Sequence, residues 1–238
     1  MAYQGKKVVI LGGGTGMGLA LAEKIVGLGG QVVVCGRNEA RLQAVADRLG
    51  AAVSVAAFDL GDEQAVKQAF TAIGAFDHLV STAAQLTFAP AVELTTEQVQ
   101  TMLVSKFWGP FYASKYAAPH LAKDGSITFF SGLAAYRPAP GASIVASLNA
   151  GLEGFAMTLA LELKPVRVNV VSPGVVDTPT WDFLSAADRK GLFDSVAGSL
   201  PVGRVGQAAD LADAALAVMG NGFINATVLH VDGGGRVA

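Results

Sequence analysis

The sequence predicts an α/β fold in which one parallel, doubly wound sheet carries helices on both faces. Short β-rich runs alternate with longer helical stretches from one end of the chain to the other. A glycine-rich turn at 12–18 directly follows the first apolar run at 8–11. The 238 residues are 52% apolar, which suits one large domain spanning 1–238 with a substantial core.

Seven short apolar runs are predicted to be strands. Helical stretches between them imply crossover connections, and therefore parallel strands. The predicted strands are 7–11, 31–35, 53–57, 78–81, 127–130, 167–171 and 227–231. In a sheet of this kind, ligands bind outside the carboxyl ends of the strands.

The segments between the strands show helical periodicity, which is clearest at 62–73. Asp62 is placed to cap the first turn of this helix, and apolar residues fall on one of its faces. The other predicted helices are 16–29, 97–121, 145–163 and 207–219. Within 97–121 we expect Pro110 to bend the helix and Gly109 to pack closely against a neighbour.

Charge and cysteine content argue against several classes of function. Lys and Arg number 17 against 19 Asp and Glu, with no basic cluster, so nucleic acid is not an expected partner. The single cysteine, Cys35, lies in an apolar run and is expected in the core. No metal ligand is predicted. We find no charged-then-apolar leader and no apolar run long enough for a bilayer, so we expect a soluble, cytoplasmic protein without a membrane partner.

The glycine-rich turn at 12–18 is typical of a phosphate-binding loop. Glycine permits positive φ and brings bare backbone close to a ligand, and the following helix presents free N–H groups to an anion. Gly12, Gly16 and Gly18 fit the spacing G-x-x-x-G-x-G, whereas the commoner G-x-G-x-x-G does not fit. We therefore expect this turn to hold the pyrophosphate of a dinucleotide.

The end of the second predicted strand indicates which dinucleotide is bound. In NAD-binding folds an acidic residue about 20 residues past the glycine turn holds the ribose hydroxyls. Here the chain has Gly36, Arg37 and Asn38, so a 2′-phosphate is not repelled and the guanidinium can pair with it. NADP(H) is therefore preferred over NAD(H), although Arg37 can also be a solvated arginine at a helix start. Asp59 is either an acceptor for the adenine amino group or a turn or cap residue.

These motifs, in this order, resemble the short-chain dehydrogenase/reductase family nearly from end to end. The matching segments are Asp59, 77–80, 169–174 with Thr178, and 228–234. The resemblance implies a single Rossmann-type domain with a lid at about 178–200. The candidate cofactor-binding residues are Gly12, Gly14, Thr15, Gly16, Met17, Gly18, Arg37, Asn38, Asp59, Leu60, Ala83, Pro173, Gly174, Val176 and Thr178.

The same resemblance places different residues at each position of the family's catalytic set. With 152–155 fixing the register of the helix, the family tyrosine corresponds to Val145 and the family lysine to Asn149. The family serine corresponds to Gly132, and the helix asparagine to Lys106. Reduction of a carbonyl needs a proton donor and oriented hydrogen bonds, and valine supplies neither.

One cation and one amide remain in this volume with their positions exchanged. We hypothesise that Lys106 supplies the charge, either binding ribose or acting as an acid, and that Asn149 positions the ligand. Alternatively, Lys106 is a helix lysine that reaches water. Ser131 and Tyr136 are further catalytic candidates, although Ser131 can satisfy backbone groups at the strand end and Tyr136 can pack over the substrate.

The favoured interpretation is an NADP(H)-dependent oxidoreductase that interconverts a carbonyl and an alcohol on a small molecule. The alternative is a catalytically inactive NADP(H)-binding sensor or partner subunit. The apolar segments 181–184 and 192–193 are predicted to roof an apolar or aromatic substrate, although helix-packing surfaces have the same composition. The resemblance also implies a homotetramer or dimer, with which the Ala-rich stretch 156–163 is compatible; ordinary internal packing explains that stretch equally well.

Overall fold

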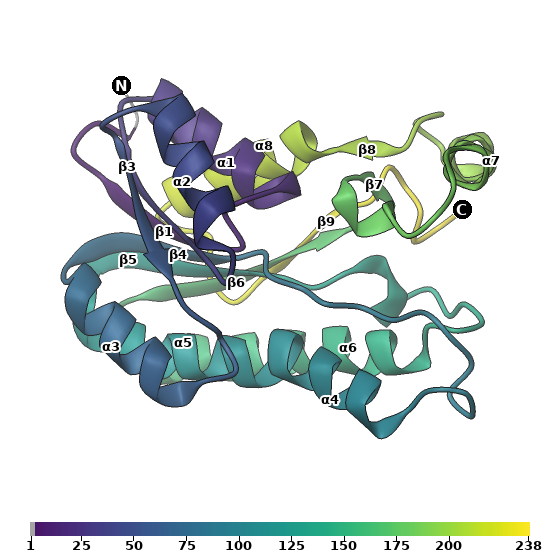
Figure 1. Cartoon of the computed structure of the whole chain (residues 1–238), viewed down its shortest axis with the longest axis horizontal. Helices are drawn as coiled ribbons and strands as arrows, with labels where there is room; N and C mark the ends of the chain where they lie inside the picture. The colour runs from purple at the N-terminus through teal and green to yellow at the C-terminus, as the bar shows by residue number, and fades with distance from the viewer. Residues whose placement is uncertain (1–2) are drawn as a thin grey trace.

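Seven parallel strands form one sheet in the computed structural model, which describes residues 3–238 (Figure 1). The strands are β1 (Lys7–Leu11), β2 (Gln31–Gly36), β3 (Val53–Ala57), β4 (Phe76–Ser81), β5 (Leu121–Phe130), β6 (Arg167–Pro173) and β9 (Val228–Val231). Their order is β3-β2-β1-β4-β5-β6-β9. The order runs outward in both directions from β1 and β4, so the predicted doubly wound fold is confirmed and its switch point lies between these strands.

Helices cover both faces of the sheet (Figure 1). One face carries α1 (Gly16–Gly27), α2 (Glu39–Leu49) and α8 (Ala208–Gly220), and the other carries α3 (Glu63–Ile73), α4 (Thr96–Leu103), α5 (Gly109–Ala117) and α6 (Ser143–Glu162). A two-stranded sheet of β7 (Val176–Asp177) and β8 (Gly206–Gln207) lies at one end of the main sheet, together with α7 (Ala186–Ser199).

The core consists of two apolar layers, one on each side of the sheet. Strand residues alternate between the layers: Val8 and Ile10 pack with α1 and α8, whereas Val9 and Leu11 pack with the helices of the opposite face. Strands buried on both faces read as continuous apolar runs, which is why the sequence reveals them. Cys35 belongs to the second layer and is 1% exposed, so its predicted place in the core is confirmed.

The predicted strands are confirmed, with ends that differ by at most two residues except in β5, which begins at Leu121, six residues before the predicted start. The predicted helix 62–73 is also confirmed, because Asp62 accepts a hydrogen bond from Ala65 N at 3.0 Å and caps α3. Two helices, α2 and α7, were not predicted. Asn38 begins α2, where its side chain accepts a hydrogen bond from Arg41 N at 2.9 Å.

The prediction of one helix over 97–121 is wrong. The chain forms α4, a π-helical turn at Val104–Trp108, α5 and a short 3-10 turn, and Leu121 already belongs to β5. Pro110 has no N–H to donate to the preceding turn, and Gly109 N donates to the carbonyl of Val104, five residues earlier. Lys106 lies on this widened turn, which therefore determines how the lysine enters the interior.

The expectation that no apolar run is long enough to span a bilayer also needs correction. By length and composition α6 meets that criterion, with a mean hydropathy of 1.5 over its most apolar window. The helix nevertheless lies along the sheet, where Leu152 and Ala156 belong to the core. It also buries the polar residues Asn149 and Glu153 against the protein. These contacts are those of a core helix.

Candidate active site

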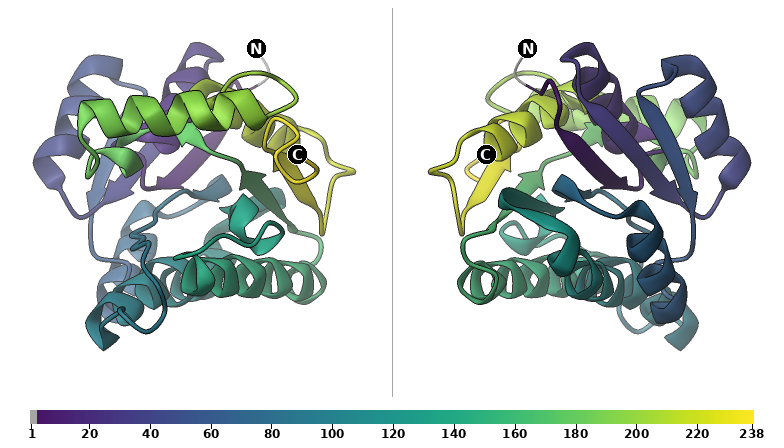
Figure 2. Two further views of the ribbon diagram at one scale, coloured as in Figure 1. Left: turned by 90° about the vertical axis from the view of Figure 1, so that its right-hand side faces the viewer. Right: turned by 90° about the vertical axis from the view of Figure 1, so that its left-hand side faces the viewer.

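A cavity of about 810 Å³ opens at the carboxyl ends of the strands. Its wall includes residues that directly follow β1, β2, β4, β5 and β6, namely Gly12, Arg37, Thr82, Ser131 and Gly174. The left view of Figure 2 looks toward this end of the molecule, with α7 above and α6 below. The cavity therefore lies where doubly wound sheets bind ligands, at the topological switch point.

The glycine turn between β1 and α1 has a backbone conformation that residues with a side chain adopt poorly. Gly12 and Gly16 have φ values of +86° and +52°, in the left-handed region. A Cβ on Gly12 would lie 2.8 Å from Ala83 N, and one on Gly18 would lie 2.4 Å from the carbonyl oxygen of Gly12. The compact turn brings the amino end of α1 to the cavity, and a helix amino end favours a phosphate.

The predicted cofactor-binding residues divide into two groups in the structure. Those that line the cavity are Gly12, Thr15, Gly16, Met17, Arg37, Asp59, Leu60, Ala83, Pro173, Gly174, Val176 and Thr178. Gly14, Gly18 and Asn38 do not line it. Gly18 instead packs against the turn, and Asn38 caps α2. Asp59 has a turn role as well, because its Oδ1 accepts a hydrogen bond from Gly61 N at 2.8 Å.

Lys106 lies at the cavity wall beside the end of β5 and is only 5% exposed. Its Nζ donates hydrogen bonds to the carbonyl oxygens of Phe130 at 2.8 Å and Ser131 at 3.3 Å. Burial lowers the pKa of Lys106 to about 8, since the ammonium is removed from water. An ammonium has three N–H donors, so one is left for a ligand. The lysine therefore does not behave as a surface residue that reaches solvent.

Asn149 faces the same cavity from α6 and is 3% exposed. Within residues 3–238 its Oδ1 has no hydrogen-bond partner. Its Nδ2 lies only 2.9 Å from the place where a Cβ on Gly132 would stand, so the absence of a side chain at 132 makes room for this amide. A buried acceptor without a donor is unfavourable, which makes Asn149 Oδ1 a ready partner for an O–H group of a ligand.

Val145, one helical turn before Asn149, is 3% exposed and adds only apolar surface to the cavity. Ser131 also lines the cavity, but its hydroxyl donates to Glu153 Oε1 at 2.6 Å. Tyr136 does not line the cavity, and its hydroxyl donates to Glu153 Oε2. The structure therefore brings Lys106, Asn149 and Ser131 together and places Tyr136 behind them.

Glu153 was not predicted as a functional residue. It is 8% exposed and lies four residues after Asn149, on the same face of α6. A carboxylate at an inward-facing position of a helix that is otherwise largely apolar is the signal that could have revealed it.

Two stacked aromatic side chains form part of the cavity wall. Phe88 and Trp181 stack with an interplanar angle of 14° and a centroid distance of 6.0 Å, and both line the cavity. Trp181 Nε1 donates to the carbonyl oxygen of Val176 at 3.0 Å, which fixes the indole. Leu192 of α7 also lines the cavity, whereas Phe183, Leu184 and Phe193 do not. Of the segments predicted to roof the substrate, Trp181 and Leu192 therefore line the cavity.

A doubly wound parallel sheet with a glycine turn and a helix amino end at its switch point defines a dinucleotide-binding α/β protein. The family model described as enoyl-(acyl carrier protein) reductase matches residues 12–235. The chain is 31% identical to a short-chain dehydrogenase/reductase, malC, of Malbranchea aurantiaca, covering 97% of this chain and 94% of the relative. It is 33% identical to L-fucose dehydrogenase of Bos taurus, covering 99% and 91%.

A solved small-chain dehydrogenase in complex with NADPH has the same fold, with a TM-score of 0.85 and 33% identity over 98% of this chain and 99% of that one. The protein belongs to the short-chain dehydrogenase/reductase family of oxidoreductases. Members of this family bind nicotinamide cofactors, and the residues around the cavity fit such a group. The tight glycine cradle suits a pyrophosphate, and the orphaned Asn149 Oδ1 suits a hydroxyl donor.

Proposed function

We propose that the protein is an NADP(H)-dependent oxidoreductase that interconverts a carbonyl and an alcohol at a non-standard catalytic site. The observation that carries this proposal is the buried ammonium of Lys106 at the cavity wall, where a catalytic cation is needed and a merely structural residue would be apolar. When bound, NADP(H) donates or accepts the hydride. The residues of the chain must then hold the reactants and manage the proton.

Arg37 is the basis for preferring NADP(H) over NAD(H). It lines the cavity just after β2, and within residues 3–238 its guanidinium has no hydrogen-bond partner. A planar fork of free donors matches a 2′-phosphate, and no carboxylate stands at Gly36 or Asn38 to repel it. The NADPH complex of a related dehydrogenase is in line with this preference.

Lys106 and Asn149 are proposed to have different roles at the cavity wall. A lysine whose pKa is about 8 holds its proton at neutral pH and can release it to an oxygen that gains charge, so it suits an acid in carbonyl reduction. The same cation can alternatively hold a ribose hydroxyl. Asn149 Oδ1 accepts a hydrogen bond from a hydroxyl and thereby positions the ligand.

The substrate is proposed to be small and apolar or aromatic. The Phe88–Trp181 stack and Leu192 present an apolar roof over the cavity. A flat or aliphatic carbonyl compound loses its hydration favourably against these side chains. The segment at about 178–200, held by ion pairs from Arg189 to Asp177 and Asp182, is proposed to act as the lid of the single domain.

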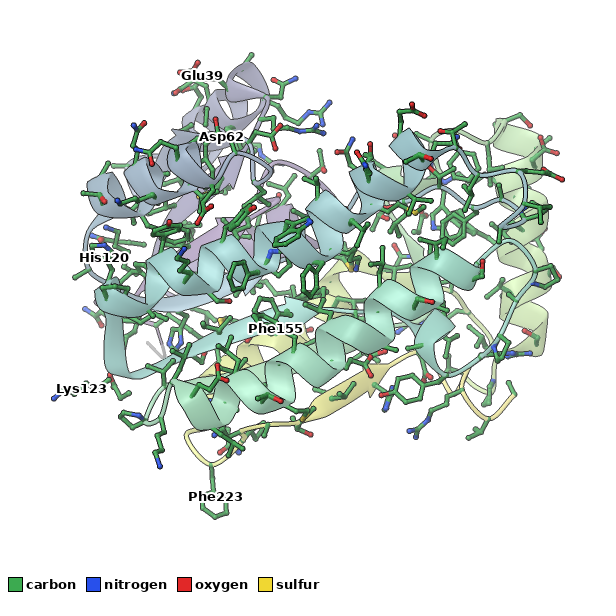
Figure 3. All side chains as sticks on the ribbon, turned by 90° about the horizontal axis from the view of Figure 1, so that it is seen from below. Glu39, Asp62, His120, Lys123, Phe155 and Phe223 are labelled. Carbon is green, nitrogen blue, oxygen red and sulfur yellow. The ribbon has the colours of Figure 1, made fainter. Side chains whose placement is uncertain are left out.

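We also propose that the protein is a homo-oligomer, either a tetramer or a dimer, and that it is cytoplasmic. Phe107 and Trp108 belong to the π-helical turn before α5 and are 37% and 43% exposed. The Phe107 ring packs against Phe155 of α6, which is labelled in Figure 3. Exposed aromatic clusters of this kind favour protein contacts. In the stretch 156–163, by contrast, Ala156, Leu159 and Ala160 pack inside the protein.

The alternative is an inactive NADP(H)-binding sensor or partner subunit, which is favoured by Val145 because this side chain supplies no proton. Fluorescence titration with NADPH and NADH, followed by single-turnover nicotinamide absorbance with aldehydes, ketones and alcohols, separates the two. Tighter NADPH binding together with oxidation of the cofactor by at least one carbonyl supports the oxidoreductase. Tight binding without oxidation, or activity that arises only after Val145→Tyr with Asn149→Lys, supports a sensor or a decayed site.

A further inference from the structure

Glu153 connects the cavity wall to the protein surface through two hydroxyl groups. The Ser131 hydroxyl donates to Glu153 Oε1 at 2.6 Å, and the Tyr136 hydroxyl donates to the other carboxylate oxygen. Ser131 lines the cavity, whereas Tyr136 lies outside it and is 41% exposed. The three side chains therefore form one continuous hydrogen-bonded path from the site to solvent.

The carboxylate at the centre of this path is unfavourable for the fold. Glu153 is 8% exposed, and within residues 3–238 no Lys, Arg or His nitrogen lies within 4.0 Å of its oxygens. Two hydroxyl donors offset only part of the cost of taking a carboxylate out of water. An apolar side chain at this position of α6 would avoid that cost. The carboxylate therefore does not serve stability, which points to a role in the chemistry of the site.

Two polar atoms on the adjacent strands β6 and β9 lack a hydrogen-bond partner among the described residues. Ser172 and His230 are register partners on β6 and β9, and within residues 3–238 Ser172 Oγ and His230 Nδ1 are buried without a hydrogen bond. The His230 ring meets the Tyr136 ring edge-on, with centroids 4.5 Å apart. Unsatisfied polar atoms of this kind mark a place where water enters. The region behind the cavity is therefore polar rather than a sealed apolar layer.

We propose that Glu153 is a positioning residue that orients the Ser131 hydroxyl at the cavity wall and exchanges its proton with the surface through Tyr136. This inference rests on the proposed interconversion of carbonyl and alcohol. Because the Ser131 proton points to Glu153, Ser131 Oγ offers the cavity an acceptor. Lys106 then supplies the positive charge on the other side of the site.

In the direction of alcohol oxidation the proton moves in one concerted step. The O–H bond of the ligand breaks and a new O–H bond forms on Ser131 Oγ, while the Ser131 proton passes to Glu153 Oε1. Glu153 becomes a neutral acid. Its carboxyl group then turns the protonated oxygen toward Tyr136, whose hydroxyl oxygen accepts this proton while the tyrosine's own proton passes to water, and the carboxylate is restored. A bound NADP⁺ would take up the hydride with its electron pair, so the residues of this path would carry protons only. Carbonyl reduction runs the same steps in reverse.

The charged and titratable groups near Tyr136 keep it in the state that this path needs. Burial and the Glu153 carboxylate raise the pKa of Tyr136 to about 12, and the cation of Arg236 opposes them. His230 packs on the ring from β9. The phenol is therefore neutral at physiological pH and remains a hydrogen-bond donor.

The test uses Glu153→Gln, with Glu162→Gln as the matched control on the exposed face of α6. In the ligand-free protein, the ionisation of Tyr136 is followed by ultraviolet absorbance. Its signal is the difference between each protein and the same protein carrying Tyr136→Phe. We expect the Tyr136 pKa to stay near 12 in the wild type and in Glu162→Gln, and to fall toward the ordinary value in Glu153→Gln. An unchanged titration in Glu153→Gln overturns the positioning role, whether or not turnover is detected.

Single-turnover kinetics test the proton exchange with the whole enzyme. Glu153→Gln is expected to slow hydride transfer at least about 10-fold and to increase the solvent isotope effect, while NADPH binding changes less than about 3-fold. Tyr136→Phe, which keeps the Ser131–Glu153 contact, is expected to show a smaller loss of the same kind. Wild-type rates and isotope effects in Glu153→Gln overturn the path. If even the wild type oxidises no cofactor, the proposed function fails, and the titration decides the role of Glu153 separately.

Discussion

Lys106 Nζ lies 2.8 Å from the carbonyl oxygen of Phe130, the last residue of β5. This hydrogen bond joins the π-helical turn between α4 and α5 to the carboxyl end of the sheet. It holds a cation at the cavity wall in a place that water reaches poorly. Burial of this charge lowers the free energy of unfolding, and it keeps the cation where the proposed chemistry needs one.

The first prediction concerns the pH dependence of stability. Burial lowers the pKa of Lys106 from 10.5 to about 8, so between these values the unfolded chain binds more protons than the folded protein. The free energy of unfolding is therefore expected to rise with pH through this window, by about 3 kcal/mol in all. Urea unfolding at several pH values measures the rise. Lys106→Met should remove it and Lys115→Met should keep it, and equal slopes in the two variants contradict the assignment.

His78 is expected to make the protein sensitive to acid. Burial lowers the pKa of His78 to about 4, with a weaker opposing effect from Asp77, and its Nδ1 lies 2.9 Å from Ser126 Oγ. Between about pH 6.5 and 4 the unfolded chain binds the additional proton, so the free energy of unfolding falls as pH falls, by about 3 kcal/mol. His78→Gln should flatten this part of the curve. His120→Gln serves as the control, and an unchanged acid limb in His78→Gln is the contrary result.

Arg37 is expected to determine the choice of cofactor. Arg37→Ala should weaken NADPH binding by about 10- to 100-fold, the loss expected for a charge-assisted contact with phosphate, and should leave NADH binding nearly unchanged. Arg48→Ala, at the far end of α2 and paired with Glu23, is the control. Fluorescence titration at constant ionic strength provides the constants. Equal losses for both cofactors would exclude a 2′-phosphate contact.

Gly12 is expected not to tolerate a side chain. Gly12→Ala places a Cβ 2.8 Å from Ala83 N at a φ of +86°, so we expect a loss above about 2 kcal/mol together with loss of NADPH binding. Gly151→Ala lies on α6 with no atom within 4 Å of the new Cβ and should stabilise the protein by about 0.5–1 kcal/mol. Thermal unfolding compares the two variants. Similar melting temperatures would show that the turn tolerates a side chain.

The fold was predictable because its signals are local and strong. The glycine turn at 12–18 and the apolar runs of the buried strands follow directly from backbone and burial physics. Asp62 was recognised as a cap for the same reason, since the pattern of its neighbours fixed the start of α3. The break at Val104–Trp108 was not predicted, because Pro110 signals a bend without specifying a π-helical turn.

The candidate site was only partly predictable, because its contacts join distant segments. The family resemblance predicts that Lys106 and Asn149 lie near the cofactor. The room that Gly132 leaves for the Asn149 amide depends on the packing of α6 against the 3-10 turn at Leu133–Ala135, which the sequence does not reveal. Tyr136 was expected beside the pocket, whereas the structure directs its hydroxyl to Glu153. A carboxylate becomes informative only when its burial is known.

The measurement that tests the central claim most directly is the single-turnover rate of NADPH oxidation by Lys106→Met, compared with Lys115→Met on the surface of α5. A carbonyl substrate found with the wild-type protein is used for both variants. The account predicts that Lys106→Met binds NADPH but transfers hydride about 100-fold or more slowly, as expected for the loss of a positioned acid or charge. Lys115→Met should retain the wild-type rate. A wild-type rate in Lys106→Met would contradict the account and remove Lys106 from the mechanism.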